Sequence, residues 1–367
     1  MNKFKSFFLR LITHKITQTV LGIGISVLSL YLALQNVSLP NMWVGLSQAR
    51  WEYVSLALIS VAINAWAKAV RWELLLGSRR QGISSAKIFI SLLVGQTLNL
   101  LLPARLGDLS RVQVIGSLGA GRIFTLGTIA VEKIFDLISY TLLFVLLLFL
   151  MPLPAWISES GLSFVGVAVV MIGGIGVITV WRKNIVMIIE QFARLLPDHL
   201  QALVLHPIHS VLKSFDIFQD QRSVLHISFW SAVVWGASLL TNQFTMYAVG
   251  IDLPVTASLL ILIGLQVGIT IPSVPGRIGI FEYICMLALT AFNIPQDTAL
   301  AYSILLHGIA FIPTTLISLL LLPVVGNPLR LDNLTVRTAG WKTAQILAEN
   351  QDNHDGDKVE NHINPRR

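Results

Sequence analysis

Charged residues are scarce in this chain of 367 residues, of which only 12% are Asp, Glu, Lys or Arg. Soluble domains carry about 25%, so the composition excludes an ordinary soluble protein. Hydrophobic residues make up 54% of the chain. Long uncharged runs such as 19–37 and 137–152 are apolar on every face, which is typical of membrane helices. The sequence therefore predicts a multi-pass integral membrane protein.

Cysteine is nearly absent, because Cys285 is the single copy. One cysteine excludes an internal disulfide and a cysteine metal cluster, and an apolar setting suits a small buried residue. His354, Asp355 and Asp357 resemble a fragment of a metal site, but they lie in a polar tail and are interpreted as solvated. We expect no metal and no cofactor.

The basic residues predict the topology, because cytoplasmic loops of membrane proteins are rich in Lys and Arg. Residues 1–18 contain four basic and no acidic residues, and no small-x-small cleavage site follows, so they are a cytoplasmic N-terminus rather than a signal peptide. Six full crossings are predicted, at about 19–36, 52–76, 124–150, 162–181, 224–249 and 299–325. Both termini are then cytoplasmic.

One apolar run, 88–102, is too short for a comfortable crossing. As a helix its 15 residues would extend about 22 Å, and the hydrocarbon core is about 30 Å thick. If it crossed, eight downstream Lys and Arg residues would lie outside the cell. A re-entrant hairpin over 88–122, entering and leaving on the cytoplasmic side, removes all eight violations.

The remaining segments complete a membrane domain at 19–325. Residues 184–223 are predicted to be cytoplasmic and amphipathic, with part of the segment on the membrane surface. Charge does not separate two thin crossings from one hairpin for 258–292, which we assign as the second hairpin. Residues 326–367 are predicted to be a polar, disordered cytoplasmic tail. The predicted fold class is all-α, a polytopic helix bundle with about six crossings, two re-entrant hairpins and an inverted repeat, in the inner (plasma) membrane.

The string P-x-R-x-G occurs twice, at 103–107 and 275–279. Proline stops a helix, glycine allows a sharp turn, the next helix start offers N–H groups to an anion, and arginine matches phosphate. Two ordinary loops that coincide by chance are the alternative. Opposed copies would form an inverted repeat whose tips meet near the midplane, where transporters bind substrate.

Ionisable residues inside predicted helices strengthen the functional interpretation. Glu132 and Asp136 lie four apart and share a helix face, and each costs about 2.5–3.5 kcal/mol at the bilayer centre. They therefore need partners or a wet cavity, for which Arg105, Arg111 and Arg277 are candidates.

Smaller roles follow for four other residues. Asp108 is expected to contact Arg111 at i,i+3, Glu282 to cap the helix after the second string, and His307 to be a proton relay or a polar contact. The alternative for the acidic pair is a structural salt bridge or a position at the membrane interface. Lys68 is interpreted as a lysine that snorkels near a helix end.

The substrate-binding candidates come from both strings, their flanks and the embedded polar residues: Asn99, Pro103, Arg105, Gly107, Asp108, Arg111, Glu132, Asp136, Pro275, Gly276, Arg277, Gly279, Glu282 and His307. No catalytic residue is predicted.

These residues resemble a known family. Residues 99–111 with the 132–136 segment resemble the first signature of the lysylphosphatidylglycerol synthase membrane-region family, and 272–282 resembles the second. Residues 71–75 resemble an arginine–tryptophan stretch of the same family, and the likeness covers about 20–325. Two positions depart from the pattern: Lys133 stands where the family usually has arginine, and Arg277 where it often has glycine.

The resemblance implies a lipid translocator, or flippase, in a bacterial or archaeal membrane. Related membrane regions move aminoacylated phosphatidylglycerol between leaflets, and a separate soluble domain makes that lipid. The tail is too short for that domain, so no synthase activity is expected, and the resemblance favours a protein that is not an enzyme. Arg105, Asp108 and Arg111 would hold the headgroup phosphate, and Glu132 and Asp136 would face a cationic group or carry protons.

Two other classes stay open. A membrane enzyme acting on a lipid phosphate, such as a glycosyl- or acyltransferase, is one, although H-x4-D and H-E-x-x-H motifs are absent from the sequence. A scaffold that recruits a lipid synthase is the other. Expected partners are membrane lipids and a separate lipid-modifying enzyme. The net charge of +7 does not indicate nucleic acid, because most basic residues lie where the positive-inside pattern requires them.

Overall fold

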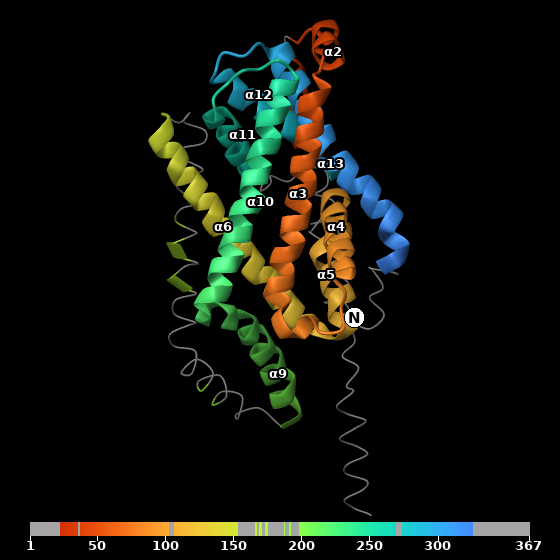
Figure 1. Cartoon of the computed structure of the whole chain (residues 1–367), viewed down its shortest axis with the longest axis vertical. Coiled ribbons are helices and arrows are strands. Elements are labelled where there is room, and N and C mark those ends of the chain that lie inside the picture. Colours follow the sequence, from red (N-terminus) through yellow and green to blue (C-terminus); the bar gives the residue numbers. More distant parts are fainter. Residues whose placement is uncertain are drawn as a thin grey trace, which may run out of the picture. The chain divides into compact units, whose positions relative to one another are not determined.

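The computed structural model describes residues 23–35, 37–102, 106–152, 198–268 and 274–325, with a few isolated positions between 166 and 191. These residues form helices and the turns between them, and no strand occurs among them. The all-α prediction is therefore confirmed for the part of the chain that is described (Figure 1).

Four helices are long and apolar enough to cross a membrane. They are α3 (Trp51–Leu76, continued by the 3-10 turn η1 to Arg80), α6 (Arg122–Leu150), α10 (Gln221–Ala248) and α13 (Gln296–Val325). A fifth candidate is a bent pair, Ile23–Leu34 and α2 (Leu39–Ser47), whose axes meet at 85°. Five of the six predicted crossings thus have counterparts; most of the sixth, 162–181, lies outside the described residues.

Two pairs of shorter helices occupy the predicted hairpin positions. The first pair is α4 (Ser85–Leu101) and α5 (Leu106–Ile115), followed by the π-helical turn η3 (Gly116–Ala120). The second is α11 (Val255–Gly268) and α12 (Ile280–Thr290), with the 3-10 turn η5 (Pro275–Arg277) between them.

Neither pair contains a helix that matches the membrane thickness. The longest, α4, has 17 residues and extends about 26 Å, and α12 with 11 residues extends about 17 Å. The members of each pair pack against each other, and α4 also contacts η5. The two short-helix pairs therefore meet, although they are far apart in sequence.

The short pairs lie among long helices. α3 and α10 pack along much of their length and lie side by side in Figure 1. α9 (Asp198–Ser214) and the 3-10 turn η4 (Phe215–Gln219) precede α10 and pack on α6. Asp220 caps α10 by accepting the N–H groups of Arg222 and Ser223. The Ser223 hydroxyl also donates to Asp220 and holds the pKa of that carboxyl below its usual value.

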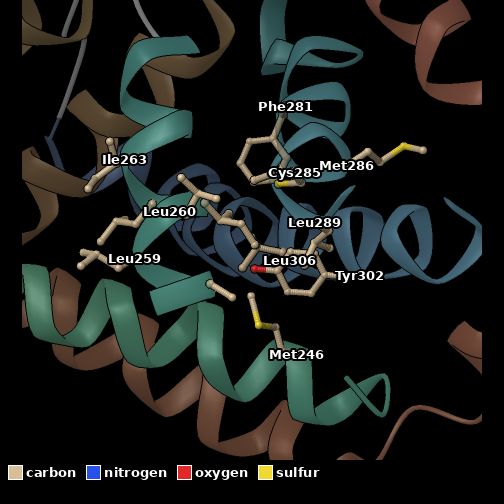
Figure 2. Close-up of a cluster of buried hydrophobic side chains, with 14 of the residues drawn as sticks. Met246, Leu259, Leu260, Ile263, Phe281, Cys285, Met286, Leu289, Tyr302 and Leu306 are labelled. Atoms are coloured by element: carbon tan, nitrogen blue, oxygen red, sulfur yellow. The ribbon is translucent and has the colours of Figure 1, made fainter. Parts of the chain in front are cut away.

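Two apolar cores anchor the two pairs. The larger core buries α11 and α12 against α10 and α13, and Figure 2 shows Leu260, Cys285 and Tyr302 within it. The second core packs α4 and η3 on α3 and α6 through residues such as Trp72, Ile88 and Ile115. Cys285 is fully buried, as its apolar setting predicted.

Glycine permits a close contact within the first pair. A Cβ on Gly107 would collide with the carbonyl oxygen of Gly95, and a Cβ on Gly95 would lie 2.6 Å from Cγ of Arg111. α4 and α5 therefore touch backbone to backbone, as small residues allow in membrane helix pairs. This crossing leaves room for the Arg111 side chain.

Candidate functional site

A polar cavity of about 470 Å³ lies between the long helices and the two short-helix pairs. Its wall is built from α3, α4, α5, α6, α10, α11, η5, α12 and α13. The charged lining residues are Lys68, Asp108, Lys133, Asp136 and Arg277. The neutral polar lining residues are Asn64, Gln96, Thr97, Asn99, Ser238, Thr241, Asn242, Gln266, Thr314 and Thr315. Such a set is unusual among apolar helices and marks the cavity as the candidate site.

Arg111 and Glu132 form a buried ion pair behind the cavity wall. Nη2 of Arg111 lies 2.6 Å from Oε2 of Glu132, and the two side chains are 3% and 7% exposed. The guanidinium also lies 3.9 Å from the ring centroid of Trp72, a favourable cation–π distance. The indole N–H of Trp72 donates to Thr128. Arg111 is thus paired with protein groups and lies outside the cavity lining.

Arg71 links the same carboxylate to Asp136. Its Nη1 lies 2.8 Å from Oδ1 of Asp136, and its Nη2 lies 3.9 Å from Oε1 of Glu132. Nη1 also donates to the hydroxyl of Ser231 on α10. The Arg71 side chain is completely buried. The acids do have cationic partners, but the partners are Arg71 and Arg111.

Asn99 and Asp108 lock the tip of the first pair. The amide N–H₂ of Asn99 donates to Oδ1 of Asp108 at 3.0 Å, and the backbone N–H of Asp108 donates to Oδ1 of Asn99 at 3.2 Å. Asp108 also lies 3.6 Å from Arg111, which confirms the predicted i,i+3 contact. Nζ of Lys133 lies 4.0 Å from the other Asp108 oxygen.

The second pair places Arg277 at the cavity through an unusual turn. Gly276 and Arg277 both have left-handed backbones, with φ of 79° and 59°, a conformation that arginine rarely adopts. Glu282 accepts the N–H of Gly279 at 2.7 Å, as the predicted helix cap requires. Its other oxygen lies 2.5 Å from Nδ1 of His307.

His307 joins α12 to α13 rather than lining the cavity. Its ring centroid lies 4.6 Å from that of Phe281 and 4.8 Å from that of Phe311, and both aromatic residues line the cavity. The polar contact expected of His307 is present, with Glu282 as the partner.

The predicted site residues thus fall into three groups. Asn99, Asp108, Asp136 and Arg277 line the cavity. Arg111, Glu132, Glu282 and His307 form buried pairs behind it, whereas Gly107, Pro275, Gly276 and Gly279 shape the turns and the helix crossing. Pro103 and Arg105 lie outside the described residues.

Three residues of α3, namely Asn64, Lys68 and Arg71, were missed as site residues. Lys68 was interpreted as snorkelling near a helix end, but it lines the cavity. Asn64, Lys68 and Arg71 are spaced by four and three residues, so they share one helix face. That polar stripe on an apolar helix was the signal that this face contacts polar groups, but it did not show which groups those are. Within the described ranges, no group of His, Cys, Asp and Glu is arranged to hold a metal ion.

Comparison with known proteins gives a family match and a similar membrane protein. The family model described as the lysylphosphatidylglycerol synthase TM region matches residues 19–318. The UPF0104 membrane protein PH1989 of Pyrococcus horikoshii is 24% identical over an alignment of 313 positions, which covers 76% of this chain and 91% of the relative. No solved structure gives a significant match.

Proposed function

Since the chain belongs to the lysylphosphatidylglycerol synthase TM region family, we propose that it moves a lipid between the two leaflets of the cell membrane. The headgroup would pass through the polar cavity, and the acyl chains would stay in the surrounding bilayer. No chemical bond is made or broken, so the proposed protein is a translocator and not an enzyme.

The observation that supports this function best is the polar cavity itself. Its volume of about 470 Å³ falls within the range of small-ligand sites, and its wall includes α3, α6, α10 and α13, which are long enough to span a bilayer. A charged headgroup pays a large desolvation penalty in hydrocarbon. Amides, hydroxyls and charges along its path would replace water and lower that barrier.

The two short-helix pairs suggest how the cavity would reach both sides. We propose that α4–α5 and α11–α12 are re-entrant hairpins of an inverted repeat, inserted from opposite faces of the membrane. Contact between α4 and η5 and the shared cavity lining support this arrangement. Alternating exposure of one site is the mechanism that such repeats serve in transporters. In this orientation both termini are cytoplasmic, and the membrane is the plasma membrane.

The proposal is tested with the full chain in liposomes that contain a trace of fluorescent phosphatidylglycerol. Dithionite added outside bleaches only outer-leaflet label, so leaflet exchange raises the bleached fraction above about half. We expect exchange with the wild-type chain and slower exchange with Asp136→Asn, which removes a cavity charge. Asp252→Asn, at an exposed position away from the cavity, is the matched control and should exchange like wild type.

Two outcomes of this assay would favour the two alternative functions, a membrane enzyme or a scaffold. A change of lipid mass in the same liposomes would indicate a membrane enzyme acting on a lipid phosphate. Bleaching is measured with phosphatidylglycerol, phosphatidylcholine and phosphatidylinositol in turn. If it stops at half with all three lipids, translocation is contradicted, and a scaffold that recruits a lipid-modifying enzyme is the remaining interpretation.

A further inference from the structure

Lys68 is a cavity cation for which the described residues provide no ion pair. It lies within α3, away from both helix ends, and its side chain lines the cavity. Among the described residues no ion pair or hydrogen bond engages its ammonium group, whereas Arg71, Arg111 and Lys133 each lie within 4.0 Å of a carboxylate. An ammonium group without a counter-ion among apolar membrane helices is costly. A bound anion would remove that cost.

The surrounding charges define how much negative charge the site accepts. The ionic cluster of α3, α5 and α6 contains four cations, Lys68, Arg71, Arg111 and Lys133. It contains three carboxylates, those of Asp108, Glu132 and Asp136, and each lies against a cation other than Lys68. One positive charge is left over among these described residues of the cluster, and it lies on Lys68 at the cavity wall. A phosphodiester, with its single negative charge, suits the site, whereas a cationic headgroup would be repelled.

The neutral lining is suited to hydroxyl groups. Gln96 and Gln266, one from each short-helix pair, line the cavity and make no hydrogen bond to another described residue. Oγ1 of Thr97 is buried and also lacks a partner among the described residues. An amide offers both donors and acceptors, as a sugar or glycerol hydroxyl does. These side chains can therefore bind an uncharged polyol on several sides.

We propose that the cavity binds an anionic phospholipid with an uncharged polyol headgroup, and that Lys68 pairs with its phosphodiester. This inference rests on the proposed function, because it takes the cavity as the lipid site. It names the substrate class: lipids of the phosphatidylglycerol or phosphatidylinositol type, in preference to zwitterionic or aminoacylated lipids.

Lipid binding by the purified full-length protein, measured by native mass spectrometry, tests the inference without any transport assay. Phosphatidylglycerol, phosphatidylcholine and lysylphosphatidylglycerol are added in turn. We expect phosphatidylglycerol to bind tightest. Lys68→Met should weaken its binding about tenfold or more, the effect expected for a lost charged hydrogen bond. Lys68→Arg should retain most of the affinity, and Lys213→Met, an exposed lysine on α9, should change nothing.

Several results would overturn the inference. Equal affinity of the wild-type chain for the three lipids would contradict headgroup selection, and this measurement needs no variant. Unchanged binding by a folded Lys68→Met chain would contradict the assigned residue. Displacement of the lipid by an equal concentration of glycerol 3-phosphate would show that the ligand is a soluble phosphate ester and not a lipid.

The inference and the translocation proposal fail separately. Selective, Lys68-dependent binding without leaflet exchange would retain the binding site and contradict transport. Leaflet exchange without headgroup preference would retain transport and contradict the substrate class.

Discussion

At the scale of single residues, the buried charges are organised around Glu132. One carboxylate serves two arginines, because Arg111 and Arg71 approach its two oxygens. Nε of each arginine is buried without a hydrogen-bond partner among the described residues. Neither guanidinium therefore has spare hydrogen bonds that could replace a lost carboxylate. The loss of one partner from a buried pair costs far more than the pair contributes.

Glu132→Gln is therefore expected to destabilise the protein by about 3–5 kcal/mol. The amide keeps the shape but leaves two buried arginines with one negative charge fewer. Equilibrium unfolding in mixed detergent and dodecyl sulfate micelles measures the change. Glu52→Gln is the control, since the Glu52–Arg50 pair is exposed, and it should have no measurable effect. Equal stability of the two variants would argue against Glu132 as the centre of the network.

Arg277 illustrates a conflict between backbone and side chain. Its φ of 59° is left-handed, which costs a residue with a Cβ about 1–2 kcal/mol relative to glycine. The side chain nevertheless lines the cavity. Strain that persists at a site residue is an indication of function.

The comparison of Arg277→Gly with Arg277→Ala isolates that strain, because both variants lose the same guanidinium. We expect the glycine variant to be more stable than the alanine variant by about 1 kcal/mol, and both to exchange lipid more slowly than wild type. Thermal unfolding in detergent and the dithionite assay provide the two readouts. A more stable alanine variant would mean that the turn is not left-handed in solution.

At the scale of elements, the first short-helix pair depends on a close crossing. α4 and α5 meet at Gly95 and Gly107, where a Cβ on Gly107 would strike the Gly95 carbonyl oxygen and lie 2.7 Å from the backbone nitrogen of Asn99. Backbone atoms cannot move aside as a flexible side chain does. The crossing in turn holds Asn99 and Asp108 at the cavity.

Gly107→Ala is accordingly expected to destabilise the protein by about 1–3 kcal/mol, the usual cost of overpacking, and to reduce lipid exchange. Gly236→Ala on α10 is the matched control, because nothing lies within 4 Å of the added methyl group. Alanine favours helix by about 0.5–1 kcal/mol over glycine, so the control should be neutral or stabilising. Thermal unfolding of the two purified variants distinguishes a specific crossing from a general glycine effect.

At the scale of the whole molecule, the long helices define the two sides of the membrane. α10 separates α9 and η4 from the connection to α11. Since a helix of 28 residues extends about 42 Å, its ends should lie on opposite sides of a bilayer. Positive-inside reasoning places the α9 side in the cytoplasm.

Single-cysteine labelling tests this topology, starting from a Cys285→Ala chain. In intact cells an impermeant maleimide should label Asp252→Cys, at the α10–α11 connection, and should leave Lys213→Cys unlabelled until the membrane is opened. Both positions are exposed, so access and not burial decides the result. The opposite pattern would invert the proposed orientation. In the wild-type chain, buried Cys285 should react only after unfolding.

Much of this protein could be predicted from local patterns. Hydropathy identified the four long helices, because crossing a bilayer requires about 20 apolar residues in succession, and charge scarcity identified the class. The helix cap by Glu282 and the contact between Asp108 and Arg111 could also be predicted, since both contacts are made within three residues of sequence.

The tertiary structure alone decided which charges pair and which residues surround the cavity. Arg71 and Asp136 lie 65 positions apart, on α3 and α6, and meet only because the packing of the bundle turns those two faces inward. Helical periodicity shows which residues share a face, but it carries no information about the helix opposite that face. For the same reason the sequence could not show that Lys68 lines the cavity and has no ion pair with a described residue, because that depends on Asp136 being held by Arg71.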